Sequence, residues 1–263
     1  MGADERHAKG GHMSEAAQLT GAQLSEMIGL IGGADSVELK LTISDADRYS
    51  TLKALEVDPL DAEIRQVVFF DTPDLVLNKA GLVVRSRRVQ NAADDSTVKL
   101  RPVVPNDLPE ELRRTADFVV EVDAMPGGFV CSGSYKGKLK QGELKALLQG
   151  QNTIRKLFSK PQRVFYKQHA PEGLDLDDLT PLGPITVLKL KFAPKGFNRR
   201  MVAELWFYPD GSRILELSTK CAPNEAFQVS AEARAFLADR GVDTGGEQQT
   251  KTRTALEFFT SGQ

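Results

Sequence analysis

One stretch, from Val67 to Arg88, constrains the fold of this chain more than any other part of the sequence. A β-branched and aromatic run ends at Asp71-Thr72-Pro73, a short apolar helical turn follows, and Gly81 ends that turn. A second strand then opens, with Arg85 and Arg87 two residues apart. Because alternate residues of a strand share one face, we expect the two guanidinium groups to project side by side.

The paired arginines have two explanations at this stage. A guanidinium presents a planar fork of donors that matches phosphate oxygens, so a pair on one strand face suits an anionic ligand. A solvated strand face without any ligand can carry the same pair. The stretch alone leaves both explanations open.

The composition is that of an ordinary soluble globular protein, with 41% hydrophobic and 27% charged residues among 263. A chain of this length forms one large domain or two small ones and needs no disulfide staples. Its net charge of −2 provides no bulk attraction to nucleic acid or membrane, so a polyanion site requires a local concentration of base. Cys131 and Cys221 are the only cysteines, which excludes a disulfide framework and makes a reducing cytoplasm the simplest location. No apolar run approaches the ~20 residues of a membrane span, and no signal-peptide core is present.

The N-terminal segment is expected to lie outside the folded domain. Residues 1–12 end in a Gly-His pair before a second Met, which is typical of an expression leader, and this leader would include His7 and His12. Residues 13–35 follow as a helical extension. His169 is then the only remaining histidine, so a site built on several histidines is excluded.

Alternation of apolar and polar residues predicts the strands. It is strictest at 36–43, where four apolar residues share one face. Further strands are expected around the two arginines and at 67–71, 97–101, 118–123, 162–167, 186–192, 201–207 and 213–218. Helices are expected at 22–30, 45–57, 139–158 and 225–240, with a closing segment at 251–259.

In strand after strand, one face is apolar and the other carries charges of both signs. The bases on these charged faces are Lys40, Arg85, Arg87, Lys99, Arg101, Lys189, Lys191 and Arg200. The acids are Glu38, Glu121, Asp123, Glu204 and Glu216. If the apolar faces point inwards, the chain forms an ordinary barrel with a charged outside. If helices cover the apolar faces instead, the charges line a lumen wide enough for a ligand, and a polyphosphate with its divalent metal ion would fit it.

Several of these segments resemble the CYTH domain, also called the triphosphate tunnel metalloenzyme family. The segments are the run from Phe70 to Asp74 followed by Gly81 to Arg87, the basic pair Lys99-Leu100-Arg101, the acidic strand from Glu121 to Asp123, and the opening Glu38-Leu39-Lys40. The resemblance is best from Ser36 to Asp123 and weaker from Gln162 to Phe259. It favours the arrangement in which the charges face inwards.

The resemblance implies an α+β fold, an eight-stranded antiparallel barrel with helices outside, formed by a single domain over residues 36–263. It also implies a triphosphate bound along the barrel axis together with Mg²⁺ or Mn²⁺. The implied catalytic residues are Glu38, Lys40, Arg85 and Arg87. The implied phosphate-binding residues are Lys40, Arg85, Arg87, Lys99, Arg101, Arg200 and Lys251, and the implied metal ligands are Glu38, Glu121, Asp123, Glu204 and Glu216.

Two positions depart from the family pattern. Ser36 replaces the first glutamate of the opening E-x-E-x-K motif, and Ser218 replaces the second glutamate of a late E-x-E motif. A hydroxyl binds a divalent cation more weakly than a carboxylate does, so we expect weaker metal binding or one metal ion in place of two, and reduced activity.

Three functions follow, in this order of preference. The first is metal-dependent hydrolysis of a linear triphosphate, whether inorganic, thiamine-linked or nucleotide. The second is non-catalytic binding of polyphosphate or nucleotide, and the third is a class IV adenylate cyclase, for which Phe158, Phe165 or Trp206 would have to stack the base although a core position suits them better. The expected partner is a triphosphate-containing small molecule or polyphosphate, with no nucleic acid and no membrane, and a homodimer is left open.

Overall fold

The computed structural model describes residues 20–245, 248 and 251–261. The predicted leader at 1–12 and residues 13–19 of the predicted extension lie outside the described residues. The rest of that extension contains helix α1 (Gly21–Gly33), whose first turn is capped by Thr20 and Gln23 in a reciprocal capping box.

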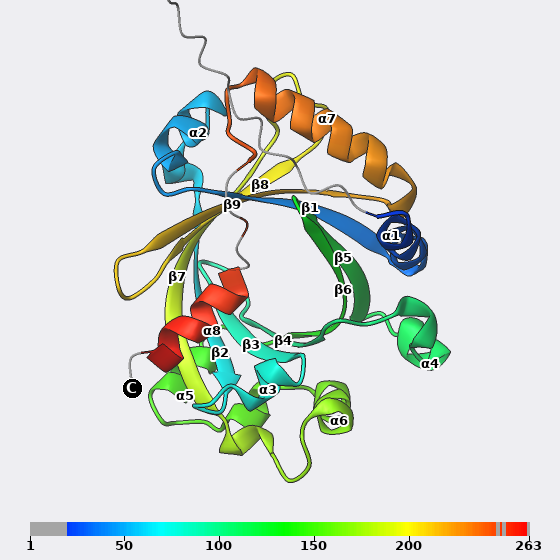
Figure 1. Cartoon of the computed structure of the whole chain (residues 1–263). Coiled ribbons are helices and arrows are strands. Elements are labelled where there is room, and N and C mark those ends of the chain that lie inside the picture. The colour runs from blue at the N-terminus through cyan, green and yellow to red at the C-terminus, as the bar shows by residue number, and fades with distance from the viewer. Residues whose placement is uncertain (1–19, 246–247, 249–250, 262–263) are drawn as a thin grey trace, which may run out of the picture.

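Nine strands form a closed barrel (Figure 1). They are β1 (Ser36–Ile43), β2 (Glu63–Asp71), β3 (Leu82–Val89), β4 (Asp95–Leu100), β5 (Phe118–Met125), β6 (Gly128–Lys138), β7 (Thr180–Phe192), β8 (Met201–Phe207) and β9 (Arg213–Cys221). Around the barrel the order is β1-β5-β6-β4-β3-β2-β7-β8-β9, and antiparallel pairing of β9 with β1 closes it. The pairing of β1 with β5 is parallel and runs from Ser36 opposite Glu121 to Leu39 opposite Ala124.

The α+β barrel with outer helices is therefore confirmed, with two corrections. The barrel has nine strands where eight were expected, and the β1–β5 pair makes it mixed where a wholly antiparallel barrel was expected. The missed strand is β6, whose Gly- and Ser-rich sequence lacks apolar alternation. The expected strand at 162–167 is instead helix α6 (Lys160–His169), which begins with a capping box formed by Ser159 and Gln162.

Most helices lie on the outside of the barrel (Figure 1). Besides α1 and α6 they are α2 (Arg48–Ala54), α3 (Val76–Lys79), α4 (Glu110–Arg113), α5 (Glu143–Leu148), α7 (Ala226–Asp239) and α8 (Lys251–Ser261). Short 3₁₀ helices occur at Pro59–Asp61, Pro105–Asp107, Ile154–Leu157, Leu176–Asp178 and Pro223–Glu225. Among the described residues, no helix has the length and apolar character that a membrane-spanning helix needs.

The apolar faces of the strands point outwards, towards these helices. On β1, Leu41 packs in one buried cluster with Ala233 and Leu237 of α7, while Val37 belongs to a second cluster that includes Phe165 of α6. The charged faces consequently point into the barrel, which is the arrangement that the resemblance favoured.

Helix α8 differs from the others because it packs against one end of the barrel interior. Its Ala255 and Leu256 are buried in a third cluster with Val67, Val83 and Trp206, which are residues of the inner wall. The helix thereby covers apolar residues of the inner wall. Figure 1 shows α8 in front of β2 and β7.

The Asp71-Thr72-Pro73 motif has a structural role. Asp71 is buried, and its carboxylate accepts hydrogen bonds from the backbone N–H groups of Thr72 (2.8 Å), Leu77 (2.9 Å) and Asn78 (3.0 Å). It thus fixes the short helix α3 between β2 and β3. At Gly81, which has φ +78°, a Cβ would lie 2.4 Å from the carbonyl oxygen of Arg101, so the entry into β3 requires glycine.

Replacing Asp71 by Ala should destabilise the protein by about 2–4 kcal/mol, because it leaves three N–H donors without their acceptor. Urea unfolding would measure the loss. The matched control is Asp74→Ala on the exposed side of the same turn, which should change the free energy of unfolding by less than about 0.5 kcal/mol. Equal effects of the two substitutions would contradict the capping role.

Candidate active site

The inner face of the barrel forms a cavity of about 250 Å³ that is rich in base. Five acidic side chains line it, namely Glu38, Glu121, Asp123, Glu204 and Glu216. Ten basic side chains line it, namely Lys40, Arg65, Arg85, Arg87, Lys99, Arg101, Lys136, Lys189, Lys220 and Lys251. The lining therefore carries an excess of five positive charges, although the whole chain has a net charge of −2.

Of the twelve site residues predicted from sequence, the structure brings eleven together around this cavity. The exception is Arg200, which is exposed before the start of β8 and does not line the cavity. Lys191, which was grouped with the inward bases, is likewise exposed.

Four basic residues of the lining were not among the predicted site residues: Arg65, Lys136, Lys189 and Lys220. Lys189 was already visible on a charged strand face. Arg65 and Lys220 lie just beyond the predicted ends of their strands, so extending the alternation by two residues would have found them. Lys136 belongs to β6, which the sequence pattern did not show.

Asp123 joins two lysines near the middle of the lining. Its carboxylate lies 2.9 Å from the ammonium of Lys40 and 3.4 Å from that of Lys99, and its side chain is 7% exposed. Burial alone would raise the pKa of Asp123, but the two ammonium groups hold it well below its ordinary value. Burial opposes the charge on Lys40 as well, yet Asp123 and Glu38 raise its pKa, so the amine stays protonated.

Glu204 and Glu216 lie directly opposite each other on β8 and β9 and share the ammonium of Lys251 from α8. The Lys251 Nζ lies 2.6 Å from Glu216, and a second lysine, Lys189, lies 2.8 Å from Glu204. Burial opposes ionisation of Glu204, but Lys251 and Lys189 together keep its pKa well below the ordinary value. The C-terminal helix therefore contributes a cation to the site.

Another carboxylate, Glu121, lies at the solvent-accessible part of the lining. It pairs with Lys220 and, at 3.5 Å, with Lys136. These two lysine side chains are 52% and 48% exposed, whereas the lysines deeper in the lining are 14–18% exposed. The cavity thus has an open, basic mouth.

Two arginines of the lining have no ionic partner within the described residues. Arg87 pairs with Asp95 at 2.9 Å, but neither Arg85 nor Arg101 forms an ion pair or side-chain hydrogen bond in that part of the chain. Burial lowers the pKa of Arg85 to about 10, and the neighbouring charge of Arg87 adds to the effect. At neutral pH both guanidinium groups remain charged without a direct ion pair, although Asp95 and Glu204 attract Arg85, and Asp123 attracts Arg101, through space.

The carboxylates fit a divalent metal ion only in part. Among the described residues, no three acidic, histidine or cysteine side chains are grouped as a metal site. Glu204 and Glu216 can nevertheless share one cation, as the ammonium of Lys251 demonstrates. Mg²⁺ is commonly held by one or two carboxylates together with substrate phosphates, so this pair fits a metal ion that arrives with its ligand.

The two serine departures have different positions. The Ser218 hydroxyl donates to Glu38 at 2.9 Å, which places it where a second carboxylate would adjoin Glu38. Ser36 is not part of the cavity lining, and its buried hydroxyl has no hydrogen-bond partner among the described residues. Ser218 does not line this cavity either, but its hydroxyl contacts Glu38, which does, so Ser218 is the departure that bears on the site.

Replacing Arg85 by Met should stabilise the protein by roughly 1–2 kcal/mol, because a buried charge without a partner is removed. The lowered pKa means that the charged form is disfavoured in the folded state, so the cost is fully present at pH 7 and fades only above about pH 10. Arg87→Met, which breaks the pair with Asp95, should instead destabilise by about 1 kcal/mol. Thermal unfolding of both variants at pH 7 is the measurement, and destabilisation by Arg85→Met would show that this guanidinium is compensated.

Comparison with known proteins identifies solved structures that have a similar fold. The search of family models gave no match, and neither did the search of curated proteins. A solved structure of a candidate adenylyl cyclase from Hippeastrum, which has a dominant triphosphatase activity, matches with a TM-score of 0.62 and 15% identity over 84% of this chain and 95% of that chain. A candidate adenylate cyclase from Bacillus halodurans matches with a TM-score of 0.56 and 14% identity over 84% of this chain and 97% of that chain. At these identities the likeness shows the fold, and this chain has the same kind of barrel.

Proposed function

We propose that the cavity binds a linear triphosphate and hydrolyses it with the help of a divalent metal ion. The observation that carries the proposal is the excess of buried positive charge, above all the unpaired guanidinium groups of Arg85 and Arg101. Guanidinium groups bind phosphate oxygens through parallel N–H donors, and a low-dielectric cavity strengthens that attraction. A polyanion would supply the charge that the lining lacks.

We assign different roles to the residues of the lining according to their position. Arg85, Arg87 and Arg101 would bind phosphate oxygens, with Lys40 and Lys99 beside them, held in place by Asp123. These cations stabilise the negative charge that develops on the transferred and leaving phosphates. Water is the nucleophile, so the reaction needs no nucleophilic side chain.

Glu204 and Glu216 would hold the metal ion, with Glu38 as a further carboxylate on β1. A bound Mg²⁺ or Mn²⁺ polarises a phosphoryl oxygen and lowers the pKa of a coordinated water. Glu121 and Asp123, which were also predicted as metal ligands, each pair with two lysines, and we assign them the positioning of those lysines.

A non-catalytic binder is the second candidate, and one observation favours it. The hydroxyl of Ser218 occupies the place beside Glu38, so the carboxylate set is smaller than the family pattern. The cyclase has less support from the aromatic residues. Phe158 and Phe165 are buried in the core outside the barrel wall, and only Trp206 of the three lines the cavity.

Incubation with inorganic triphosphate and Mg²⁺ or Mn²⁺ should release phosphate, and the double variant Arg85→Ala/Arg87→Ala should reduce release at least ~100-fold. Lys191→Ala on the exposed side of β7 is the matched control and should retain the activity. Phosphate release is measured over time, with binding followed by calorimetry in parallel. Tight triphosphate binding without release would establish the binder, and the absence of both would refute the proposal.

Restoring the carboxylate at Ser218 tests the metal site. Ser218→Glu should tighten Mn²⁺ binding by roughly tenfold in a calorimetric titration, because it adds a negative charge beside Glu38. Ser36→Glu adds the same charge at a hydroxyl that contacts none of the lining carboxylates and should have the smaller effect. Unchanged affinity in Ser218→Glu would count against a metal ion at this end of β9.

A further inference from the structure

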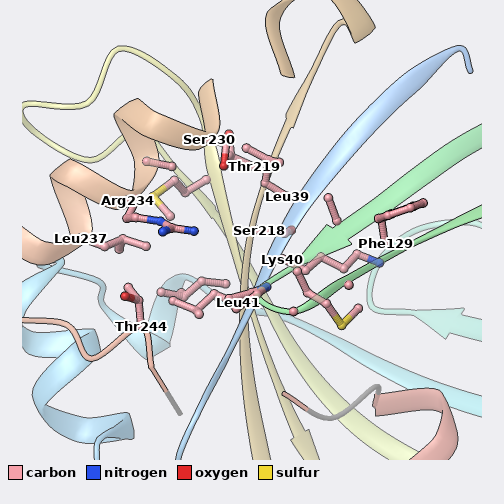
Figure 2. A pocket seen from close by; sticks show the side chains of 18 of the residues that line it. Leu39, Lys40, Leu41, Phe129, Ser218, Thr219, Ser230, Arg234, Leu237 and Thr244 are labelled. Carbon is pink, nitrogen blue, oxygen red and sulfur yellow. The ribbon is translucent and has the colours of Figure 1, made fainter. Parts of the chain in front are cut away.

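A second cavity, of about 290 Å³, lies between α7 and the outer face of β1 and β9 (Figure 2). Its wall is mostly apolar, with Leu39, Leu41 and Leu217 from the strands and Leu237 from α7. Ligand cavities are typically apolar with a few polar groups that fix orientation. Here the polar groups include Ser230 and Arg234 of α7, and Figure 2 shows that both project from the helix towards the strands.

This second cavity adjoins the basic cavity. Lys40 and Met125 line both of them. The reason is the short parallel pairing of β1 with β5, which ends at Leu39 opposite Ala124 while β1 continues to Ile43. Beyond Leu39, β1 and β5 are no longer paired.

Beyond Leu39, the edge of β1 that faced β5 is hydrogen-bonded to a side chain. The N–H of Thr42 donates to the Gln248 side chain at 2.9 Å, and the amide of Gln248 donates back to the carbonyl oxygen of Thr42. Hydrogen bonds to a side chain thus take the place of a β5 partner along this part of β1.

The charges around the second cavity restrict its ligand. Its two charged lining residues are Lys40 and Arg234, and no carboxylate lines it among the described residues. Arg234 forms no ion pair within the described part of the chain. A cationic group would be repelled there, whereas a neutral, largely apolar ring would gain contacts with the leucines and a guanidinium to stack on.

We propose that the second cavity binds the neutral organic group of a triphosphate ester whose phosphates occupy the basic cavity. This inference rests on the proposed triphosphate binding and names the substrate class, a nucleoside triphosphate in preference to thiamine triphosphate, whose thiazolium is cationic. Lys40, which lines both cavities, contacts the ester where phosphate and organic group meet.

The test compares ATP, thiamine triphosphate and inorganic triphosphate by calorimetric titration of the full chain and of the Ser230→Phe variant. Ser230 is half-buried at the second cavity, so the added ring fills that space. ATP should bind the unsubstituted protein at least tenfold more tightly than inorganic triphosphate does, and Ser230→Phe should remove that advantage. Binding of inorganic triphosphate should change by less than twofold.

Ala231→Phe is the matched control, since Ala231 is the exposed neighbour on α7 and lines neither cavity. It should leave all three affinities unchanged, which separates filling of the cavity from a general effect on the helix. Thermal unfolding of both variants reports whether the fold is retained. Arg234→Ala, at an exposed position on the rim of the second cavity, gives a second test and should weaken ATP binding several-fold.

The possible outcomes separate the two proposals. If inorganic triphosphate binds but ATP has no advantage, or if Ser230→Phe leaves the advantage intact, the second cavity is not the site and the proposed function stands. If thiamine triphosphate gains as much as ATP, the assignment of a neutral group is wrong. If no triphosphate binds, the proposed function itself fails.

Discussion

The structure depends on the pairing of charges that the barrel removes from water. An ammonium or carboxylate buried alone costs several kcal/mol, so the deep carboxylates are paired with cations, and two of them with two cations each. Asp123 serves Lys40 and Lys99, and Glu204 serves Lys189 and Lys251. Because basic residues outnumber acidic residues on the inner wall, an excess of positive charge remains after this pairing. The apolar surface that stabilises the fold must then lie elsewhere, and it lies on the outer faces of the strands under the helices.

Helix α8 contributes both apolar contacts and a cation to the inner wall of the barrel. Its Lys251 lies between Glu204 and Glu216, two carboxylates at directly opposed positions that would repel each other without a cation. Its Ala255 and Leu256 cover the apolar end of the inner wall. The helix is thus held by burial and by ion pairs at once. A metal ion between the same carboxylates, as proposed above, would take the place of the lysine ammonium, so its binding would be coupled to the position of this helix.

Much of the barrel and most of the site could be predicted, since alternation of apolar and charged residues is a local signal. β1 and β8 have the predicted ends, and eleven of twelve predicted site residues reach one cavity, ten from the charged strand faces and Lys251 from the family resemblance. The prediction fails for β6, whose sequence does not alternate between apolar and polar residues. β6 is rich in glycine because Gly133 packs under the ring of Phe118 and Gly137 against Gln162, both closer than a Cβ allows. Parallel pairing of β1 with β5 has no sequence signal, since it arises only when the barrel closes.

That parallel pair also explains why the barrel has an interrupted wall. β5 runs in the same direction as β1, ends at Met125 and turns into β6, while β1 continues for four residues beyond its last β5 partner. The interruption falls at Lys40, which lines both the basic cavity and the second cavity, so the two cavities meet at a residue that the proposed phosphate binding uses.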